Sequence, residues 1–197
     1  MTSEFPRAPG ARQPGTRRSG KRNGPQTPVP GTPADVTPEA DPYEVARSIV
    51  LRQLSMAPRS RHQLHTKLLE RGVSDGAAQE ILDRYEEVQL IDDAEFARMW
   101  VRSRAQTRSL ARSAIRRELA DKGIAAELAD EALSQRTDED ERAAAAELVR
   151  RKVRPLADPG DRGAQDKQVR RLVGMLSRKG YSPSIAFSIV KDVLAEQ

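Results

Sequence analysis

The sequence predicts an all-α protein, an elongated and curved array of three tandem three-helix repeats. Residues 115–124, which read I-R-R-E-L-A-D-K-G-I, are typical of the end of a helix. Ile115 and Leu119 lie four apart and share one helix face, and Lys122 suits the negative end of the helix dipole. Gly123 can adopt the left-handed conformation that closes a helix, and Ile124 returns the chain to the core.

The same pattern occurs twice more, with an apolar residue eight before a glycine, a leucine four before and an apolar residue one after. The two copies are Leu64, Leu68, Gly72 and Val73 upstream, and Leu172, Leu176, Gly180 and Tyr181 downstream. Apolar residues also follow each glycine in one helical phase, at the fifth, sixth, ninth and tenth positions. Because the glycine, the caps and the spacing recur together, a repeated unit explains the pattern better than chance similarity between amphipathic helices.

The predicted domain organisation is a tail over residues 1–41 and three repeats over residues 42–91, 92–136 and 137–197. The first 40 residues contain eight prolines, five glycines, six basic and three acidic residues, and very few apolar ones. A segment of this composition cannot bury a core, so we expect it to be disordered. Its charge could add weak, salt-sensitive attraction to nucleic acid, although such a tail is more often only a solvated extension.

Capping residues divide the first repeat into three helices. The caps are Asp41 (with Pro42 in the first turn and Glu44 placed for a capping box), Ser60 (with Gln63) and Ser74, whose helix runs towards Val88. The apolar stripe of the first helix is Val45, Ala46, Ile49, Val50 and Leu54.

The second and third repeats follow the same order of signals. In the second repeat, Asp92 and Glu95 form a predicted capping box, the middle helix follows Arg108, and the last helix spans residues 126–134. In the third, Thr137 with Asp140 precedes an alanine-rich helix over residues 143–154, and Ser182 with Pro183 caps a final helix that reaches the C-terminus. Residues 155–166, rich in Asp, Pro and Gly, are predicted to be an insertion.

The composition argues against an enzyme. The chain has no cysteine, so disulfides and thiol chemistry are excluded. His62 and His65 could place two imidazoles on one helix face, but nothing nearby completes a metal site, and a solvated pair is favoured. The acidic run 138–141 lies at a helix start, where the dipole favours it. We therefore expect no catalytic residue, no cofactor and no metal.

The chain also lacks a run of eighteen apolar residues and an apolar signal core, so we expect a cytoplasmic protein that does not enter the membrane. The net charge of +5 permits contact with nucleic acid without requiring it. Residues 98–122 and 147–179 each carry a local net charge of +6, whereas residues 75–95 carry −7 and residues 127–141 carry −6. Basic middle helices and acidic last helices predict separate positive and negative faces in a stacked array.

The segments L-I-D-D-A-E-F-A-R-M-W-V-R-S-R and I-R-R-E-L-A-D-K-G-I, preceded by P-R-S-R-H-Q-L-H-T-K-L-L-E-R-G, resemble the RecX family of recombination regulators. The resemblance covers residues 42–197 and is most specific at the aspartate pair before Phe96 and at Glu118-Leu119 with Lys122-Gly123. It implies a protein that binds the groove of the RecA recombinase filament near the DNA. Such proteins usually inhibit the ATPase, co-protease and strand-exchange activities of RecA in recombination, DNA repair and the SOS response. Family members often have a glycine-containing basic loop where residues 107–112 read T-R-S-L-A-R, so the shape of this loop stays open.

Ten basic side chains are the predicted contacts with the filament or its DNA. They are Lys67, Arg71, Arg108, Arg112, Arg116, Lys122, Arg170, Arg171, Arg178 and Lys179. Arg108, Arg112 and Arg116 are spaced by four, which predicts three guanidinium groups on one helix face, suited to phosphate or carboxylate oxygens. The middle repeat is therefore the expected main contact, and a solvated face with local pairs such as Arg117 to Asp121 is the alternative.

Two other functions stay open. A free-standing DNA-binding transcription regulator would usually be dimeric and read base edges from one recognition helix. Here the basic residues spread over three repeats, and no helix mixes Arg with Asn or Gln as a base reader does. A purely structural scaffold is disfavoured by the segregation of charge. We therefore expect a monomer that binds the RecA filament, with single- and double-stranded DNA as further candidate partners.

Overall fold

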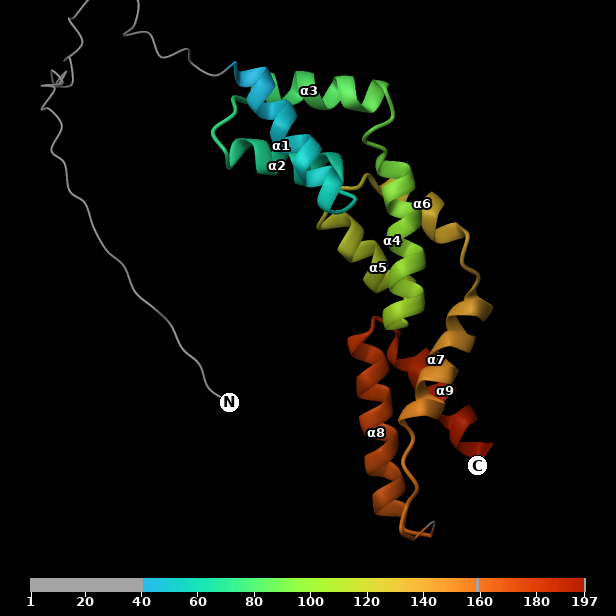
Figure 1. Ribbon diagram of the computed structural model, residues 1–197. Helices are drawn as coiled ribbons and strands as arrows, with labels where there is room; N and C mark the ends of the chain where they lie inside the picture. The colour runs from blue at the N-terminus through green and yellow to red at the C-terminus, as the bar shows by residue number, and fades with distance from the viewer. Residues whose placement is uncertain (1–40, 159, 197) are drawn as a thin grey trace, which may run out of the picture. The chain divides into compact units, whose positions relative to one another are not determined.

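The computed structural model describes residues 41–158 and 160–196, so the predicted N-terminal tail lies outside the described residues. Over these ranges the chain forms nine α-helices and no strand, and no helix there is both long and apolar enough to cross a membrane (Figure 1). The helices are α1 (Pro42–Met56), α2 (Arg61–Leu69), α3 (Asp75–Glu87), α4 (Asp93–Arg108), α5 (Arg112–Ala120), α6 (Ala126–Ser134), α7 (Asp138–Lys152), α8 (Arg162–Arg178) and α9 (Pro183–Ala195). The predicted all-α repeat fold is confirmed.

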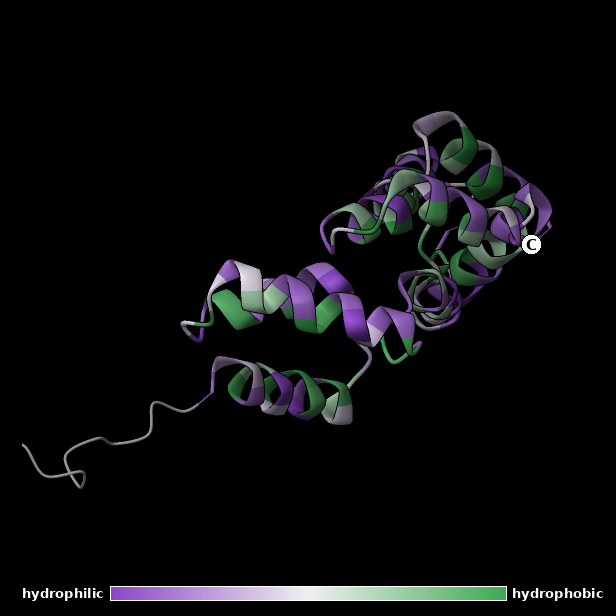
Figure 2. Cartoon of the chain, turned by 90° about the horizontal axis from the view of Figure 1, so that it is seen from above, coloured by the Kyte–Doolittle hydropathy of each residue, from purple (hydrophilic) through white to green (hydrophobic). Residues whose placement is uncertain are grey.

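Each set of three consecutive helices packs around its own core. The apolar residues buried in the second helices are the leucines and isoleucine of the repeated pattern: Leu64 and Leu68, Ile115 and Leu119, Leu172 and Leu176. Figure 2 shows hydrophobic and hydrophilic residues on different sides of the helices, as expected where one face packs inward. The boundaries proposed after residues 91 and 136 fall in the connections between α3 and α4 and between α6 and α7.

The three turn glycines adopt the predicted left-handed conformation, with φ of 80° at Gly72, 74° at Gly123 and 92° at Gly180. In each turn the amide after the glycine donates to a carbonyl five residues earlier, as Ile124 N does to Leu119 O at 3.1 Å. This bond satisfies a carbonyl that the end of the helix leaves without a partner. The prediction from the spacing is confirmed.

Most of the predicted caps form, but two of the capping boxes do not. Ser60 with Gln63 and Thr137 with Asp140 make reciprocal boxes. Asp92 caps α4, yet Glu95 does not reach back to it, because its carboxylate binds Arg98 Nε at 2.9 Å and Arg102 at 3.1 Å. Asp41 likewise caps α1 through Tyr43 N, without a returning bond from Glu44.

The predicted insertion over residues 155–166 is partly wrong. Asp161 caps α8 by accepting from Ala164 N at 3.0 Å, so the helix already begins at Arg162. As a result α8 has 17 residues, whereas α2 and α5 have 9 each. Counted from the turn glycine, the additional turns of α8 all precede the part that corresponds to α2 and α5.

Candidate nucleic-acid interface

The predicted stripe of Arg108, Arg112 and Arg116 on one helix face is wrong, because Arg108 lies on α4 whereas Arg112 and Arg116 lie on α5. Arg108 is the last residue of α4 and Arg112 the first of α5. Between them Ser109 takes a left-handed φ of 47°, which ends α4 and redirects the chain. This residue also fixes the shape of the loop that the sequence left open.

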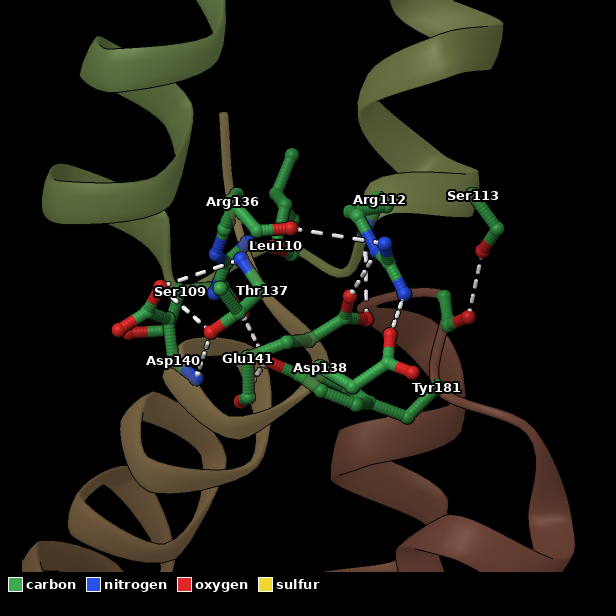
Figure 3. Close-up of polar contacts among 11 residues, drawn as sticks. Ser109, Leu110, Arg112, Ser113, Arg136, Thr137, Asp138, Asp140, Glu141 and Tyr181 are labelled. Carbon is green, nitrogen blue, oxygen red and sulfur yellow. Dashed lines mark hydrogen bonds and ion pairs between the residues drawn. The ribbon is translucent and has the colours of Figure 1, made fainter. Parts of the chain in front are cut away.

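Arg112 is engaged at the joint between the second and third repeats (Figure 3). Its Nε donates to Glu141 Oε2 at 2.9 Å, its backbone N donates to Glu141 Oε1 at 3.2 Å, and its guanidinium also pairs with Asp138. Both carboxylates belong to the first turns of α7. A guanidinium held by two carboxylates holds the two repeats together and is poorly placed to bind a phosphate.

Further polar contacts complete this joint. Arg136 is buried and donates to Leu110 O at 2.6 Å, and Tyr181 OH donates to Ser109 O at 3.2 Å (Figure 3). Ser113 Oγ donates to Gly180 O at 2.6 Å, while Ala111 is buried in the core of the third repeat. The loop that the sequence marked as a DNA contact is therefore largely an internal connection.

The joint between the first and second repeats uses the same geometry. Ser60 Oγ donates to Lys122 O at 2.6 Å, and Arg61 N donates to Asp93 Oδ1 at 2.9 Å. Burial raises the pKa of Asp93, against the lowering effect of the hydrogen bond and charge of Arg61. At both joints the start of a second helix meets the glycine turn of the next repeat, and an acidic residue of its first helix accepts a backbone amide.

Three more of the predicted contact residues have partners within the chain. Lys67 Nζ lies 2.7 Å from Glu70 Oε2, and Arg116 Nη2 lies 2.5 Å from Asp130 Oδ1. The Nζ of Lys122 lies over the ring of Trp100, 4.2 Å from its centroid, in a cation–π contact. These cations are at least partly compensated in the free protein.

The ring of Trp100 is the centre of a brace between α4 and α5 that the sequence did not reveal. Its Nε1 donates to Glu118 Oε2 at 2.9 Å, and Arg104 Nε donates to the same oxygen at 2.7 Å. The guanidinium carbon of Arg104 also lies 3.9 Å from the ring centroid. The most specific residues of the family pattern thus include an internal brace of the second repeat.

The predicted separation into positive and negative faces is wrong for the first two repeats. Arg61 of α2 pairs with Asp83 of α3 at 2.6 Å, as Arg116 of α5 does with Asp130 of α6. Ion pairs therefore link the basic second helix to the acidic third helix of the same repeat. Spacing along a helix does not show that two oppositely charged helices pack together.

The third repeat differs because its last helix has little acidic charge. The only acidic residue of α9 is Asp192, which lies beside Lys191. Over the described ranges, nine basic residues of this repeat have no ion pair with a carboxylate: Lys152, Arg154, Arg162, Lys167, Arg170, Arg171, Arg178, Lys179 and Lys191. Four of these were predicted from the sequence as contacts, and α8 carries five of the nine.

The positive charge continues to the joint with the second repeat. Lys179 Nζ donates to Arg108 O, and Arg171 donates to Lys152 O at 2.9 Å. Burial lowers the pKa of Lys179, and the charges of Arg108 and Lys152 lower it further. Like charges gathered without a carboxylate repel one another, and an anion bound there would remove this repulsion. We call Lys152, Arg171, Arg178, Lys179 and Arg170 the α8 basic surface.

The two histidines have separate surroundings. His65 Nε2 lies 2.7 Å from Asp75 Oδ1, whereas His62 packs against the turn at Gly123. In the part of the chain that the structure describes, no three His, Asp or Glu side chains are grouped as a metal would require.

These features define a class of protein: an all-α array of three-helix repeats with internally paired arginines and an uncompensated basic surface on its third repeat. Sequence models of two RecX domains match this chain, the first three-helix domain at residues 46–84 and the second at residues 92–133. The chain is 48% identical over 160 residues to the regulatory protein RecX of Streptomyces coelicolor, with coverage of 81% of this chain and 83% of that protein. It belongs to the RecX family.

Other relatives agree with this assignment. The regulatory proteins RecX of Mycolicibacterium smegmatis and Thermobifida fusca are 38% and 40% identical to this chain, which covers 82% and 81% of their lengths. A crystal structure of regulatory protein RecX has a TM-score of 0.64 and 28% identity, over 78% of this chain and 74% of that one. The crystal structure of RecX from Lactobacillus salivarius, at 23% identity, shares the fold with a TM-score of 0.66, over 79% of this chain and 99% of that one.

Proposed function

We propose that this protein binds the RecA–DNA filament and inhibits its ATPase, co-protease and strand-exchange activities during recombination and DNA repair. Membership of a family of regulatory proteins, over about four-fifths of the chain, carries the proposal. The protein would act without catalysis of its own, as a monomer in the cytoplasm. A free-standing transcription regulator has less support. The helix α8 does carry Gln165 and Gln168 among its arginines, but Gln168 is buried and accepts from Arg154 N at 3.4 Å, which leaves it poorly placed to read a base edge.

We further propose that the α8 basic surface, with Arg71 beside the turn at Gly72, makes the main electrostatic contact with DNA phosphates. Arg108 is left out because its Nη1 lies 4.0 Å from Glu118 Oε1. Cations already paired with carboxylates gain little from a phosphate, since one favourable contact replaces another. Unpaired cations gain the full attraction and release counterions from the DNA. This places the main contact on the third repeat rather than on the second, where the sequence analysis expected it.

The first experiment adds the protein to preformed RecA filaments on single-stranded DNA and follows ATP hydrolysis. We expect hydrolysis to fall as the protein is added, and an unchanged rate at saturating protein would contradict the proposed function. Replacing Arg170, Arg171 and Arg178 by Glu should weaken binding to the filament. It should also reduce the slope of log affinity against log salt by about 0.7 for each phosphate of single-stranded DNA that the protein no longer neutralises.

A matched control separates this surface from net charge alone. Reversing Arg7, Arg12 and Arg17 to Glu changes the net charge by the same amount, within the tail predicted from the sequence, which lies outside the described residues. We expect this variant to inhibit nearly as well as the wild type. If both triple variants lost binding equally, overall charge rather than the α8 basic surface would explain the contact. Circular dichroism of both variants checks that helix content is retained.

A further inference from the structure

The third repeat has a groove of about 600 Å³ between the start of α8, the segment before it and α9. Its apolar lining is Leu156, Val169, Phe187 and Leu194, with Arg154, Lys191 and Asp166 among its charged residues. Phe187 is 53% exposed, although a phenylalanine in a folded chain is usually buried. The groove takes no part in the ion pairs and hydrogen bonds of the two joints.

In the first repeat, an arginine and its hydrogen-bond partners occupy the corresponding space between the second and third helices. Counted from the turn glycine, Arg61 lies eleven positions before Gly72, and Gln79, Asp83 and Glu86 lie seven, eleven and fourteen after it. The Arg61 guanidinium donates to all three side chains, at 2.9 Å, 2.6 Å and 2.6 Å. The single side chain of Arg61 therefore covers the acidic face of α3. The second repeat has an acid, Asp130, at the seventh position, and this residue pairs with Arg116, which lies seven positions before Gly123.

In the third repeat, apolar or basic residues stand at the positions of the arginine and its three acceptors. Val169 replaces the arginine, while Phe187, Lys191 and Leu194 replace the glutamine, the aspartate and the glutamate. No internal guanidinium can close this face, and the additional turns of α8 together with the segment at Leu156 form further walls around it. Where the first repeat has an acidic face covered by Arg61, the third repeat therefore has an open apolar groove. The residue eleven positions after its turn glycine is the positively charged Lys191.

We propose that this groove binds an apolar side chain of a partner protein, carried on a segment with neighbouring carboxylates. The apolar lining would bury that side chain, which removes both surfaces from water. Among the described residues, Arg154 and Lys191 have no ion pair with a carboxylate. Acidic groups on the partner segment would therefore form ion pairs with them. The inference rests on the proposed function for the identity of the partner, which is then the protein component of the filament rather than its DNA.

The deciding variant closes the groove from within by introducing the kind of polar contact found in the first repeat. Val169→Arg and Phe187→Asp together place a cation opposite an acid, as Arg61 and its acceptors do in the first repeat. The probe for the groove itself is anilinonaphthalene sulfonate, an apolar aromatic molecule with a negative charge. We expect the wild type to enhance its fluorescence and the double variant to lose most of this enhancement. Leu51→Asp, which charges an apolar residue of α1 that is 41% exposed, is the matched control.

Filament binding tests the partner. The double variant should require at least about tenfold more protein than the wild type to inhibit RecA, as expected when the anchoring pocket of an interface is removed. Its affinity for bare single-stranded DNA should be unchanged. Unchanged dye fluorescence, unchanged inhibition, or an equal loss of affinity for bare DNA would each overturn the inference. Failure of the wild type itself to act on RecA would instead overturn the proposed function, and the dye would still decide whether the groove binds an apolar anion.

Discussion

At the scale of single residues, the three turn glycines share a backbone conformation but differ in their surroundings. A Cβ at Gly72 would meet no atom within 4 Å, whereas one at Gly123 would clash with His62 and one at Gly180 with Ala114. Gly123 and Gly180 form the turns on which the preceding repeats pack, and no described repeat precedes Gly72. Gly72 is therefore needed only for its backbone conformation, whereas Gly123 and Gly180 also leave room for the repeat that packs against them.

This difference predicts unequal costs for the same substitution. Gly72→Ala should destabilise the fold by about 1 kcal/mol, because alanine resists a positive φ. Gly123→Ala should cost clearly more, since its Cβ must also displace His62 from the joint. Urea denaturation followed by circular dichroism measures both values. Equal losses for the two variants would show that the joint tolerates the additional methyl group.

The buried carboxyl group of Asp93 predicts a dependence on pH. Because burial raises its pKa in the folded state, the folded protein binds this proton more tightly than the unfolded chain. Its contribution to stability is therefore greatest in acid and decreases as pH rises through the raised pKa. Asp93→Asn keeps an oxygen to accept the Arg61 amide and removes the charge. Relative to this variant, the wild type should lose stability as the pH rises above about 4, the ordinary pKa of an aspartate, measured by urea unfolding at each pH. A constant difference as the pH rises would argue against the raised pKa.

At the scale of elements, α4 and α5 are joined by a charged group that is mostly covered. Glu118 accepts from both Trp100 and Arg104 on a side chain that is 29% exposed. Glu118→Ala leaves both donors without this acceptor, and we expect a loss of about 2 kcal/mol in the free energy of unfolding. Asp130→Ala breaks a more exposed pair and should cost less than about 1 kcal/mol. Similar losses in thermal or urea unfolding would contradict a special role for the brace.

The joint between the second and third repeats separates stability from binding. Arg112→Ala removes contacts to Glu141 and Asp138, so we expect a loss of about 1 to 3 kcal/mol. The salt dependence of filament binding should remain that of the wild type, because Arg112 serves as an internal contact. A smaller salt slope for this variant would return Arg112 to the set of phosphate contacts.

At the scale of the whole molecule, every buried core residue of the described chain lies between Ala46 and Val193. Deleting residues 1–40 should therefore leave the melting temperature and helix content per folded residue essentially unchanged, because the deleted segment has too few apolar residues to contribute a core. A markedly lower melting temperature of the shortened chain, measured by calorimetry, would mean that the folded part begins earlier than expected.

The helices, the phase of their apolar faces, most caps and the three glycine turns could all be predicted from the amino-acid sequence. These features depend on residues within about four positions of one another, and local periodicity records them directly. The sequence also carried the pattern at Phe96, Glu118 and Lys122 by which the family could be recognised. From the sequence we placed the start of the middle helix after Arg108 and yet counted Arg108 in the stripe on that helix; Ser109, in the left-handed conformation, separates Arg108 from α5.

Which cations are free depends on how the helices pack, and the sequence did not reveal it. Arg112 meets Glu141 and Arg61 meets Glu86 across 29 and 25 positions of sequence, and no spacing rule within one helix reports such pairs. The sequence therefore placed the main contact on the second repeat, whereas the unpaired charge lies on α8. The groove beside Phe187 also depends on how helices pack. Val169, at the position that corresponds to Arg61, cannot form the contacts by which Arg61 covers α3. Electrostatic attraction depends on the distance between groups in space, and the packing of helices sets that distance.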